Sequence, residues 1–355
     1  MKNPSLLNLC IAIVCASAIV GCQSGSESKA EAPSSKPTSE QKLKIVYIPK
    51  NTGNPYFNEV NRGFEEACKE LGADFTTTGP ATADATSQIP IIKDQIQRGV
   101  DVIAISANSP DALNQVLDQA RSRGVVVITV DADLAGNESH RDACVLPTDF
   151  SQVGTGQVEV MAELMGFEGE FAILSATTDA PNQNAWIAKM KEVLKDAKYS
   201  KMKLVTVAYG DDEPQKSTTE TEALLTRHPN LKGVISPTSV GLAAAAQVFE
   251  QRGVYPGGPN AKGEGIHLTG LSTPDQLRRF VGAGVLSKFQ LWSPYDEGYI
   301  AAHLGHKIKL GGLKPQAGTE VDFPKLGKRT FTQNLEITAS PLITFTKENI
   351  DEYKF

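Results

Sequence analysis

The chain has 355 residues, of which 40% are hydrophobic, 21% charged and 6% aromatic, and its formal net charge is −6. This is the composition of an ordinary globular protein, and the length predicts more than one hydrophobic core because domains average roughly 150 residues. Acidic residues (41) outnumber Lys and Arg (35). A nucleic-acid partner is therefore not expected, because binding phosphates requires clustered positive charge.

The first 22 residues have the pattern of an export signal. Lys2 precedes an apolar run from Leu9 to Val20 that is too short to span a bilayer and that ends at Gly21-Cys22. The pattern resembles a bacterial lipoprotein signal, in which residues 1–21 are removed and Cys22 is lipidated. An ordinary signal peptide or an uncleaved anchor is the alternative.

A polar segment, residues 22–42, separates this signal from the rest of the chain. It has no large apolar residue between Gln23 and Gln41, so it cannot bury enough surface to offset the entropy of ordering. We expect a flexible tether. The protein is accordingly predicted to be exported, periplasmic or at the cell surface, and to be attached to a membrane through its lipid anchor only.

Cysteines and histidines do not predict a metal site. Only Cys68 and Cys144 follow the tether, too few for a disulfide framework, and a buried free thiol at Cys68 is favoured over a bridge. His303 and His306 are three apart on a predicted helix without a third ligand nearby in sequence, so we expect solvated surface histidines. No metal and no cofactor is predicted.

Short β-branched runs alternate with amphipathic stretches in the first half of the chain. The pattern predicts strands at Leu43–Ile48, Asp74–Thr78, Val100–Ser106 and Val125–Val130, and helices at about 56–71, 84–98 and 109–123. The last of these helices begins with Ser109-Pro110, an N-cap followed by proline, and Gly124 ends it. Several strand runs are almost continuously apolar, which is typical of parallel strands covered on both faces.

A second alternating set follows Leu146-Pro147-Thr148-Asp149. Its predicted strands are Phe171–Ser175, Leu204–Ala208, Val234–Ser236, Ile266–Thr269 and Ser287–Leu291, with helices near 151–165, 184–197, 215–227, 239–252 and 274–281. A further helix is expected at about Tyr295 to Leu310, and Pro341–Phe345 alternates like an edge strand.

These elements predict an α/β protein of two doubly wound parallel-sheet lobes joined by three crossings. We expect crossings near 147–148, near 292–293 and within 315–345. The N-terminal lobe would comprise 43–147 plus about 293–312, and the C-terminal lobe 148–292 plus part of 313–355.

Polar residues directly after the predicted strands are the candidate site residues, because strand carboxyl ends face the crevice of an open parallel sheet. The five loops concerned begin at Pro49, Asp131, Asp179, Pro237 and Gln290. Their carboxylates, carboxamides, hydroxyls and aromatic rings suit a sugar: polar groups bind neighbouring hydroxyls and a ring covers the C–H face.

Signatures of enzymes are absent from the sequence. No Gly-x-Gly-x-x-Gly follows the first strand, and neither a phosphate-binding loop nor a Gly-x-Ser-x-Gly elbow occurs. Asp131 and Asp133 could form a catalytic pair, but two aspartates at a strand end bind hydroxyls equally well. We therefore expect a binding protein and not an enzyme.

Four segments carry a resemblance to a known family. Asn51–Phe57, Thr129–Asp133, Asn182–Trp186 and Ser236–Ala246 resemble the rhamnose-binding proteins of bacterial ABC importers. Those are close relatives of the autoinducer-2-binding proteins within the ribose-binding-like periplasmic family. The similarity covers about Lys44 to Leu304.

The resemblance implies a type I periplasmic binding protein: a monomer that holds its ligand between two hinged lobes and delivers it to a permease with its ATPase. Asn182 stands where autoinducer-2 binders use aspartate and Ser239 where they use alanine, which favours L-rhamnose or a similar deoxyhexose. Autoinducer-2 binding, or sugar sensing for a signalling receptor, is the alternative. The strand-end loops and the resemblance together give these candidate substrate-binding residues: Lys50, Asn54, Phe57, Asp131, Asp133, Asn182, Gln183, Asn184, Pro237, Ser239 and Trp292.

Several of these residues have a second interpretation. Trp186 has the helical spacing of a core residue with Met190. Lys50 could serve only as an ion-pair partner of Asp131, and Pro237 only as a turn former. One of the residues in 182–184 could cap the helix that they begin.

Overall fold

A computed structural model describes residues 42–355. The predicted signal, the predicted lipidation site Cys22 and most of the predicted tether lie outside the described residues. Within the described part of the chain, no helix is both long enough and apolar enough to span a membrane.

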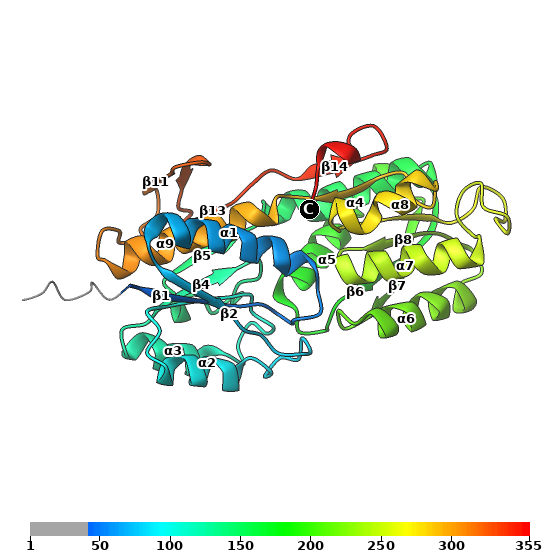
Figure 1. The fold of residues 1–355 in the computed structure, drawn as a ribbon. Coiled ribbons are helices and arrows are strands. Elements are labelled where there is room, and N and C mark those ends of the chain that lie inside the picture. Colours follow the sequence, from blue (N-terminus) through cyan, green and yellow to red (C-terminus); the bar gives the residue numbers. More distant parts are fainter. Residues whose placement is uncertain (1–41) are drawn as a thin grey trace, which may run out of the picture. The chain divides into compact units, whose positions relative to one another are not determined.

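The first sheet is parallel and has six strands (Figure 1). Their order across the sheet is β2 (Asp74–Thr77), β1 (Lys44–Ile48), β3 (Val102–Ile105), β4 (Val126–Val130), β5 (Ala143–Leu146) and β13 (Glu336–Thr338). Alternate residues of β1 face opposite cores: Tyr47 packs toward α1 (Tyr56–Leu71) and α9 (Pro294–Lys309), whereas Val46 packs toward α2 (Ile89–Gln97) and α3 (Asn114–Ser122). Helices on both faces explain why these strands are continuously apolar.

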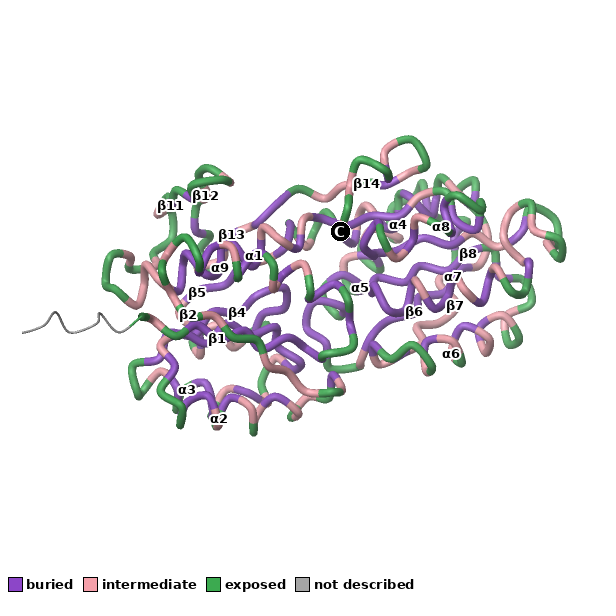
Figure 2. Tube along the Cα trace, viewed as in Figure 1, coloured by how far each residue is buried: buried purple, intermediate pink, exposed green. Residues whose placement is uncertain are grey.

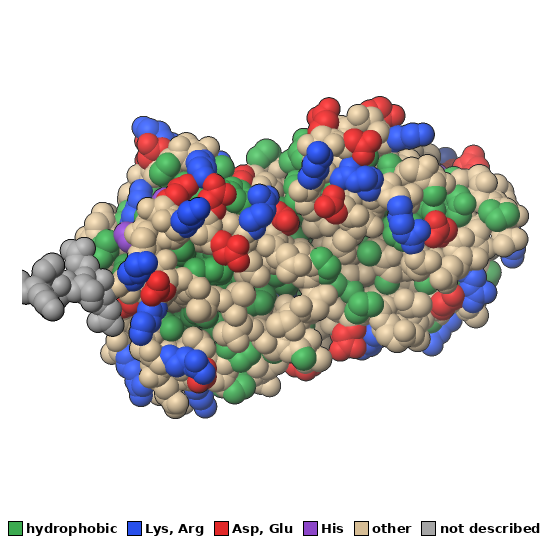
Figure 3. Space-filling view, viewed as in Figure 1, with side chains coloured by type: hydrophobic (Ala, Val, Ile, Leu, Met, Phe, Trp, Pro, Cys, Tyr) green, Lys and Arg blue, Asp and Glu red, His purple; other side chains and the backbone are tan. Residues whose placement is uncertain are grey.

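The second sheet is parallel and has four strands. Their order is β7 (Met202–Tyr209), β6 (Gly169–Ser175), β8 (Leu231–Ser236) and β9 (His267–Gly270). The helices are α4 (Phe150–Met165), α5 (Pro181–Val193), α6 (Pro214–Arg227), α7 (Ser239–Arg252) and α8 (Pro274–Gly282). α4 packs on α5, and α7 packs on both α6 and α8. Figure 2 shows the central strands of both sheets buried, whereas the edge strands β2 and β7 are mostly exposed or half-buried. On the face shown in Figure 3, basic and acidic side chains are interspersed.

The chain passes between the two sheets three times. It leaves the first sheet after β5, returns after β10 (Phe289–Leu291) and leaves again after β13 to form β14 (Ile343–Phe345). β14 pairs antiparallel with β10, and β10 contacts the second sheet through a bridge between Leu271 and Gln290. A hairpin of β11 (Glu320–Phe323) and β12 (Gly327–Thr330) precedes β13. The predicted fold class, two doubly wound lobes with a three-segment connection, is confirmed.

The helices α1 and α9 pack with their backbones unusually close. A Cβ atom at Gly298 would collide with the carbonyl oxygen of Val60, and one at Gly63 would collide with that of Tyr295. Glycine at both positions therefore allows this approach. It brings the start of α1 next to the start of α9, immediately after the second crossing.

Some sequence-based expectations about elements were wrong. The helix predicted to start at Ser109 begins at Asn114, because the Ser109 hydroxyl accepts the N–H groups of Asp111 and Ala112 and so stabilises a turn before the helix. Short strands β5 and β13 were not predicted. Cys68 and Cys144 are both buried and unbridged.

His303 is buried and not on the surface as expected. Its ring packs on Tyr299, with ring centroids 4.6 Å apart, and on Phe323 of β11. Burial lowers the pKa of His303 to about 4, so the ring is neutral at pH 7. Among the described residues, no group of three or more His, Cys, Asp or Glu side chains is arranged to hold a metal ion.

Candidate functional site

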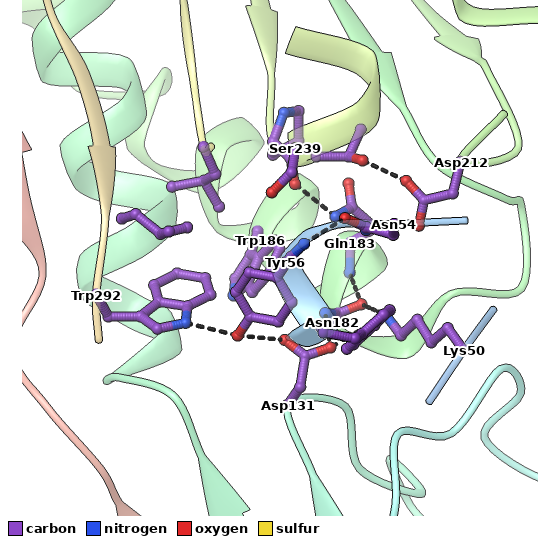
Figure 4. Close-up of a pocket in the computed structure, with 15 residues that line it drawn as sticks. Lys50, Asn54, Tyr56, Asp131, Asn182, Gln183, Trp186, Asp212, Ser239 and Trp292 are labelled. Atoms are coloured by element: carbon purple, nitrogen blue, oxygen red, sulfur yellow. Dashed lines mark hydrogen bonds and ion pairs between the residues drawn. The ribbon is translucent and has the colours of Figure 1, made fainter. Parts of the chain in front are cut away.

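The carboxyl ends of the strands in both sheets converge on one narrow cavity, and the space between its lining atoms, open solvent included, is about 340 Å³. Residues of both lobes line it (Figure 4): Lys50, Asn54, Tyr56, Phe57, Asp131, Asn182, Gln183, Trp186, Asp212, Pro237, Thr238, Ser239, Leu271, Leu291 and Trp292.

A polar network crosses the cavity between the lobes. Lys50, after β1, donates from Nζ to Oδ1 of Asn182 at 2.7 Å, and the same ammonium lies 3.5 Å from Oδ2 of Asp131. Asn182, on the first turn of α5, donates from Nδ2 to that carboxylate at 3.3 Å. All three side chains are buried, so hydrogen bonds between buried polar groups connect the lobes.

The second lobe contributes two further polar groups. Gln183 donates from Nε2 to the carbonyl oxygen of Pro237 at 2.5 Å and accepts from Ser175 at 3.1 Å. Asp212, in the loop after β7, accepts a hydrogen bond from the Thr238 hydroxyl. These contacts hold both side chains in place, which matters because a preorganised polar site loses less entropy when a ligand binds.

Both carboxylates of the cavity lie on unusual backbone. The φ angle is +66° at Asp131 and +55° at Asp212. A non-glycine residue in this left-handed region carries a cost on the order of 1–3 kcal/mol, although aspartate tolerates it better than most residues. Such conformations concentrate at functional sites, and here they occur at the two acids that line the cavity.

The electrostatics of the cavity are set by one ammonium between two carboxylates. Burial raises the pKa of Asp131, and the positive charge of Lys50 opposes that increase. Burial also raises the pKa of Asp212, and the positive charge of Lys50 again opposes the increase. No arginine is among the lining residues. The cavity therefore suits a neutral molecule rich in hydroxyl groups better than an anion.

Aromatic rings form one wall of the cavity. The ring centroids of Trp186 and Trp292 are 5.7 Å apart, and Tyr56 lies edge-on to Trp292 at 6.3 Å. Phe57 packs edge-on against Tyr56 at 5.2 Å. Trp186 is buried and also lines the cavity, so the core and cavity interpretations of this residue both hold.

Two predicted site residues do not line the cavity. The carboxylate of Asp133 forms a buried two-point ion pair with Arg141, with both N–O distances 2.6 Å, and accepts from Thr129. The left-handed turn at Asp131 sends Asp133 into the lobe. Asn184 donates to the carbonyl oxygen of Thr178 at an exposed position.

Helix geometry explains the different placement of Asn182 and Asn184. Two residues correspond to about 200° around a helix, so Asn184 lies on the opposite side of α5 from Asn182. None of the residues 182–184 is the N-cap, because α5 begins at Pro181 after Ala180.

Tyr56, Asp212, Thr238, Leu271 and Leu291 line the cavity but were not predicted. Asp212 could have been found from its position, because it follows the predicted strand Leu204–Ala208 just as Asp131 follows its own strand. Leu271 and Leu291 carry no polar signal. They became recognisable only from the packing of the second sheet.

Comparisons with known proteins agree with this architecture. Residues 45–312 match the family described as "Periplasmic binding protein domain". A D-ribose/D-allose-binding protein from Pseudomonas aeruginosa is 26% identical over 215 residues, which is 59% of this chain and 66% of that protein. The matched region covers 53 to 66% of the curated relatives' own length. The names of these relatives describe binding proteins and not enzymes.

Solved structures extend the similarity over nearly the whole described chain. An ABC transporter solute-binding protein from Clostridium phytofermentas with bound L-rhamnose is 32% identical, with a TM-score of 0.83, covering 88% of this chain and 98% of that one. A protein from Clostridium saccharobutylicum in complex with AI-2 (autoinducer-2) has a TM-score of 0.81 at 21% identity, covering 88% of this chain and 100% of that one. The second similarity concerns the fold alone.

Proposed function

The chain belongs to the periplasmic binding protein family, and from that membership we propose that it is the sugar-binding component of an ABC importer. It would hold a neutral sugar in the cavity between its lobes and present it to a permease, which works with an ATPase. The main support for this proposal is the polar network in which Lys50 of one lobe donates a hydrogen bond to Asn182 of the other lobe, next to Asp131. A ligand bound there touches both lobes and thereby stabilises their approach.

We infer that the substrate class is a deoxyhexose, with L-rhamnose as the leading candidate. The polar lining accepts and donates to hydroxyl groups, and an aromatic wall suits the C–H face of a pyranose. Phe57 and Trp292 are the candidates to contact the methyl group. The L-rhamnose complex of the Clostridium phytofermentas protein, at 32% identity, supports this choice.

Autoinducer-2 is the competing ligand. The same fold accommodates AI-2 in a structure at 21% identity. Asn182 and Ser239 replace the aspartate and alanine that the resemblance associates with autoinducer-2 binders, and this favours rhamnose. We expect the substrate-binding residues to be those of the predicted set that line the cavity, together with Tyr56, Asp212 and Thr238.

A ligand panel tests the proposal. Thermal unfolding of the purified protein is followed with L-rhamnose, L-mannose, D-ribose, D-galacturonate and autoinducer-2, because a ligand of the folded state raises stability by RT ln(1 + [L]/Kd). L-rhamnose should raise Tm most, and D-galacturonate should have no effect because no arginine lines the cavity. A shift with autoinducer-2 but with none of the sugars would overturn the proposal. L-mannose carries a hydroxyl where L-rhamnose has only a methyl hydrogen, so it reports on the methyl contact.

We also propose the export and attachment that the N-terminal sequence predicts. Lipidation at Cys22 would hold the protein on a membrane in the exported space, and the folded body would be a monomer. The variant Cys22→Ser should move the protein from the membrane to the soluble fraction without changing its sugar affinity. Retention of this variant on the membrane would contradict the lipid anchor.

A further inference from the structure

Glu297 is a completely buried acid that lies behind the cavity wall and does not line the cavity. It is on the first turn of α9, just after the second crossing, and its relative exposure is 0%. Its Oε1 contacts the hydroxyl of Tyr56 and lies 2.8 Å from Nε1 of Trp292. Its Oε2 has no hydrogen-bond partner within the described part of the chain. Glu297 thus supports two residues of the aromatic wall.

Among residues 42–355, no positive charge is found to compensate Glu297. The titratable groups facing it are Asp131 just after β4, Asp296 on its own helix and Tyr56 on α1, and Tyr47 of β1 is close enough to be affected by its charge. Lys50 pairs with Asp131 and Asn182. The pKa of Glu297 is raised well above its ordinary value, mainly by burial and secondly by the negative charge of Asp131. A buried carboxylate with an unpartnered oxygen and no cation is strongly unfavourable.

The hydrogen-bond donors around Tyr56 indicate where the proton lies. Tyr56 Oη is 2.7 Å from Nε1 of Trp292, 3.3 Å from Oδ1 of Asp131, and in contact with Glu297. Trp292 can only donate, and a tyrosine hydroxyl has one proton to give. If the Tyr56 hydroxyl donates its hydrogen bond to Asp131, the contact between Tyr56 and Glu297 requires a proton on Glu297. In this arrangement Glu297 and Trp292 donate to Tyr56, and Tyr56 donates to Asp131. Oε2 of Glu297 stays without a partner among the described residues, which costs less in a neutral acid than in a carboxylate.

We propose that Glu297 is a neutral carboxylic acid that donates to Tyr56 and thereby directs the Tyr56 hydroxyl toward Asp131, which makes Glu297 a positioning residue for the sugar site. Asp131 keeps its charge, since Lys50, Asn182 and Tyr56 all donate to it, and its remaining lone pairs accept a ligand hydroxyl. If Glu297 were ionised, the Tyr56 hydroxyl would donate its hydrogen bond to Glu297. Asp131 would then lose this donor and lie near a second negative charge. The inference rests on the proposed sugar-binding function.

An infrared experiment tests the protonation state without any ligand. A protonated carboxyl group gives a C=O band that is separate from carboxylate bands and shifts in D₂O. The spectrum of the wild type minus that of Glu297→Gln at pH 7 should contain this band. Its absence from the wild type, or its disappearance in Asp131→Asn with retention in Glu297→Gln, would overturn the proposal because the proton would not be on Glu297.

Binding experiments test the positioning role. Glutamine can donate to Tyr56 through Nε2, and Trp292 keeps its own hydrogen bond to Tyr56 at 2.7 Å, so Glu297→Gln should bind L-rhamnose within about threefold of the wild type. Glu297→Leu removes both contacts, and its affinity should fall at least about tenfold. If Glu297→Gln loses as much affinity as Glu297→Leu, the charge of Glu297 is required and the proposal is wrong.

The pH dependence of affinity separates a proton-dependent role from a merely structural one. Wild-type affinity should weaken as the pH rises and Glu297 loses its proton, whereas Glu297→Gln should lack that component. Identical profiles for the two proteins would contradict the proposal. If the wild type binds no sugar, the proposed function fails, but the infrared band still decides whether Glu297 carries a proton.

Discussion

The ammonium of Lys50 donates to Oδ1 of Asn182 at 2.7 Å, and this bond joins a loop of one lobe to a helix of the other. The amide group of Asn182 accepts from the ammonium and donates to the Asp131 carboxylate at 3.3 Å. A carboxylate in place of this amide could accept from Lys50 but could not donate to Asp131 without a proton. The amide at position 182 therefore suits a partner that already carries a negative charge.

Asn182→Asp should weaken L-rhamnose binding by about tenfold at pH 7.5, because the new carboxylate repels Asp131 at close range. The loss should be smaller at pH 5, where the acid pair can share a proton. Isothermal titration calorimetry at both pH values measures the effect. The control is Asn184→Asp, which makes the same charge change at an exposed position of the same helix. Equal losses in the two variants would show a general charge effect and not a local one.

Asp131→Asn should reduce sugar affinity at least about 100-fold, because a site built to bind hydroxyl groups loses most affinity when one acceptor is replaced. Asparagine tolerates the left-handed backbone at φ +66°, so the protein should remain folded by circular dichroism. Asp131→Ala should also abolish binding and should be less stable than Asp131→Asn by about 1–2 kcal/mol, the cost of left-handed backbone for an ordinary residue. Sugar affinity retained in either variant would contradict the assignment of Asp131.

Asp212→Asn should lower sugar affinity, whereas Asp211→Asn should not. The two residues have the same φ angle of +55°, but Asp212 is buried in the cavity wall whereas Asp211 pairs with Lys216 outside it. The comparison holds the chemical change and the backbone constant. Binding curves for both variants give the difference. Similar affinities would mean that Asp212 does not contact the ligand.

Intrinsic fluorescence should report ligand binding directly, because the chain has two tryptophans and both line the cavity. Sugar should change the emission of the wild type and of each single-tryptophan variant, Trp186→Phe and Trp292→Phe. The larger change is expected from Trp292, the proposed contact for the sugar methyl group. A ligand that raises Tm without changing the emission of either variant would have to bind outside this cavity.

Stability should depend on pH through Glu297. Its pKa is raised in the folded protein, mainly by burial, so the folded chain keeps a proton that the unfolded chain releases above about pH 4.3. The contribution of this proton to the free energy of unfolding is fully present below that pH. It is lost as the pH rises toward the pKa of Glu297 in the folded protein. Glu297→Gln cannot lose this proton and should therefore gain stability relative to the wild type between pH 5 and pH 8, as measured by urea unfolding.

The difference between the two proteins is the quantity to follow, because His303 contributes with the opposite sign. Its pKa is lowered to about 4, so protonation favours the unfolded chain as pH falls below about 6.5. That contribution is common to the wild type and Glu297→Gln and cancels in the difference. A difference that stays constant with pH would indicate that Glu297 does not titrate between the folded and unfolded states.

The local sequence determined the architecture of this protein. Runs such as Val126–Val130 are apolar at every position because helices cover both faces of a parallel sheet, and this pattern can be recognised without knowing the neighbours. Since parallel strands place their carboxyl ends at one edge, the same pattern located the loops that form the cavity. The segment that became α1, Tyr56–Leu71, was predicted with its observed bounds.

Only the tertiary structure decided which polar groups meet. Asp131 and Asp133 are equivalent in the sequence, but the left-handed backbone at Asp131 directs one to the cavity and the other to Arg141. Glu297 resembles an ordinary acid at a helix start, and its burial follows from glycine contacts between two helices distant in the chain. The placement of these side chains depends on neighbours that are distant in the sequence and on the free-energy cost of burying a charge. The local sequence pattern contains information about neither.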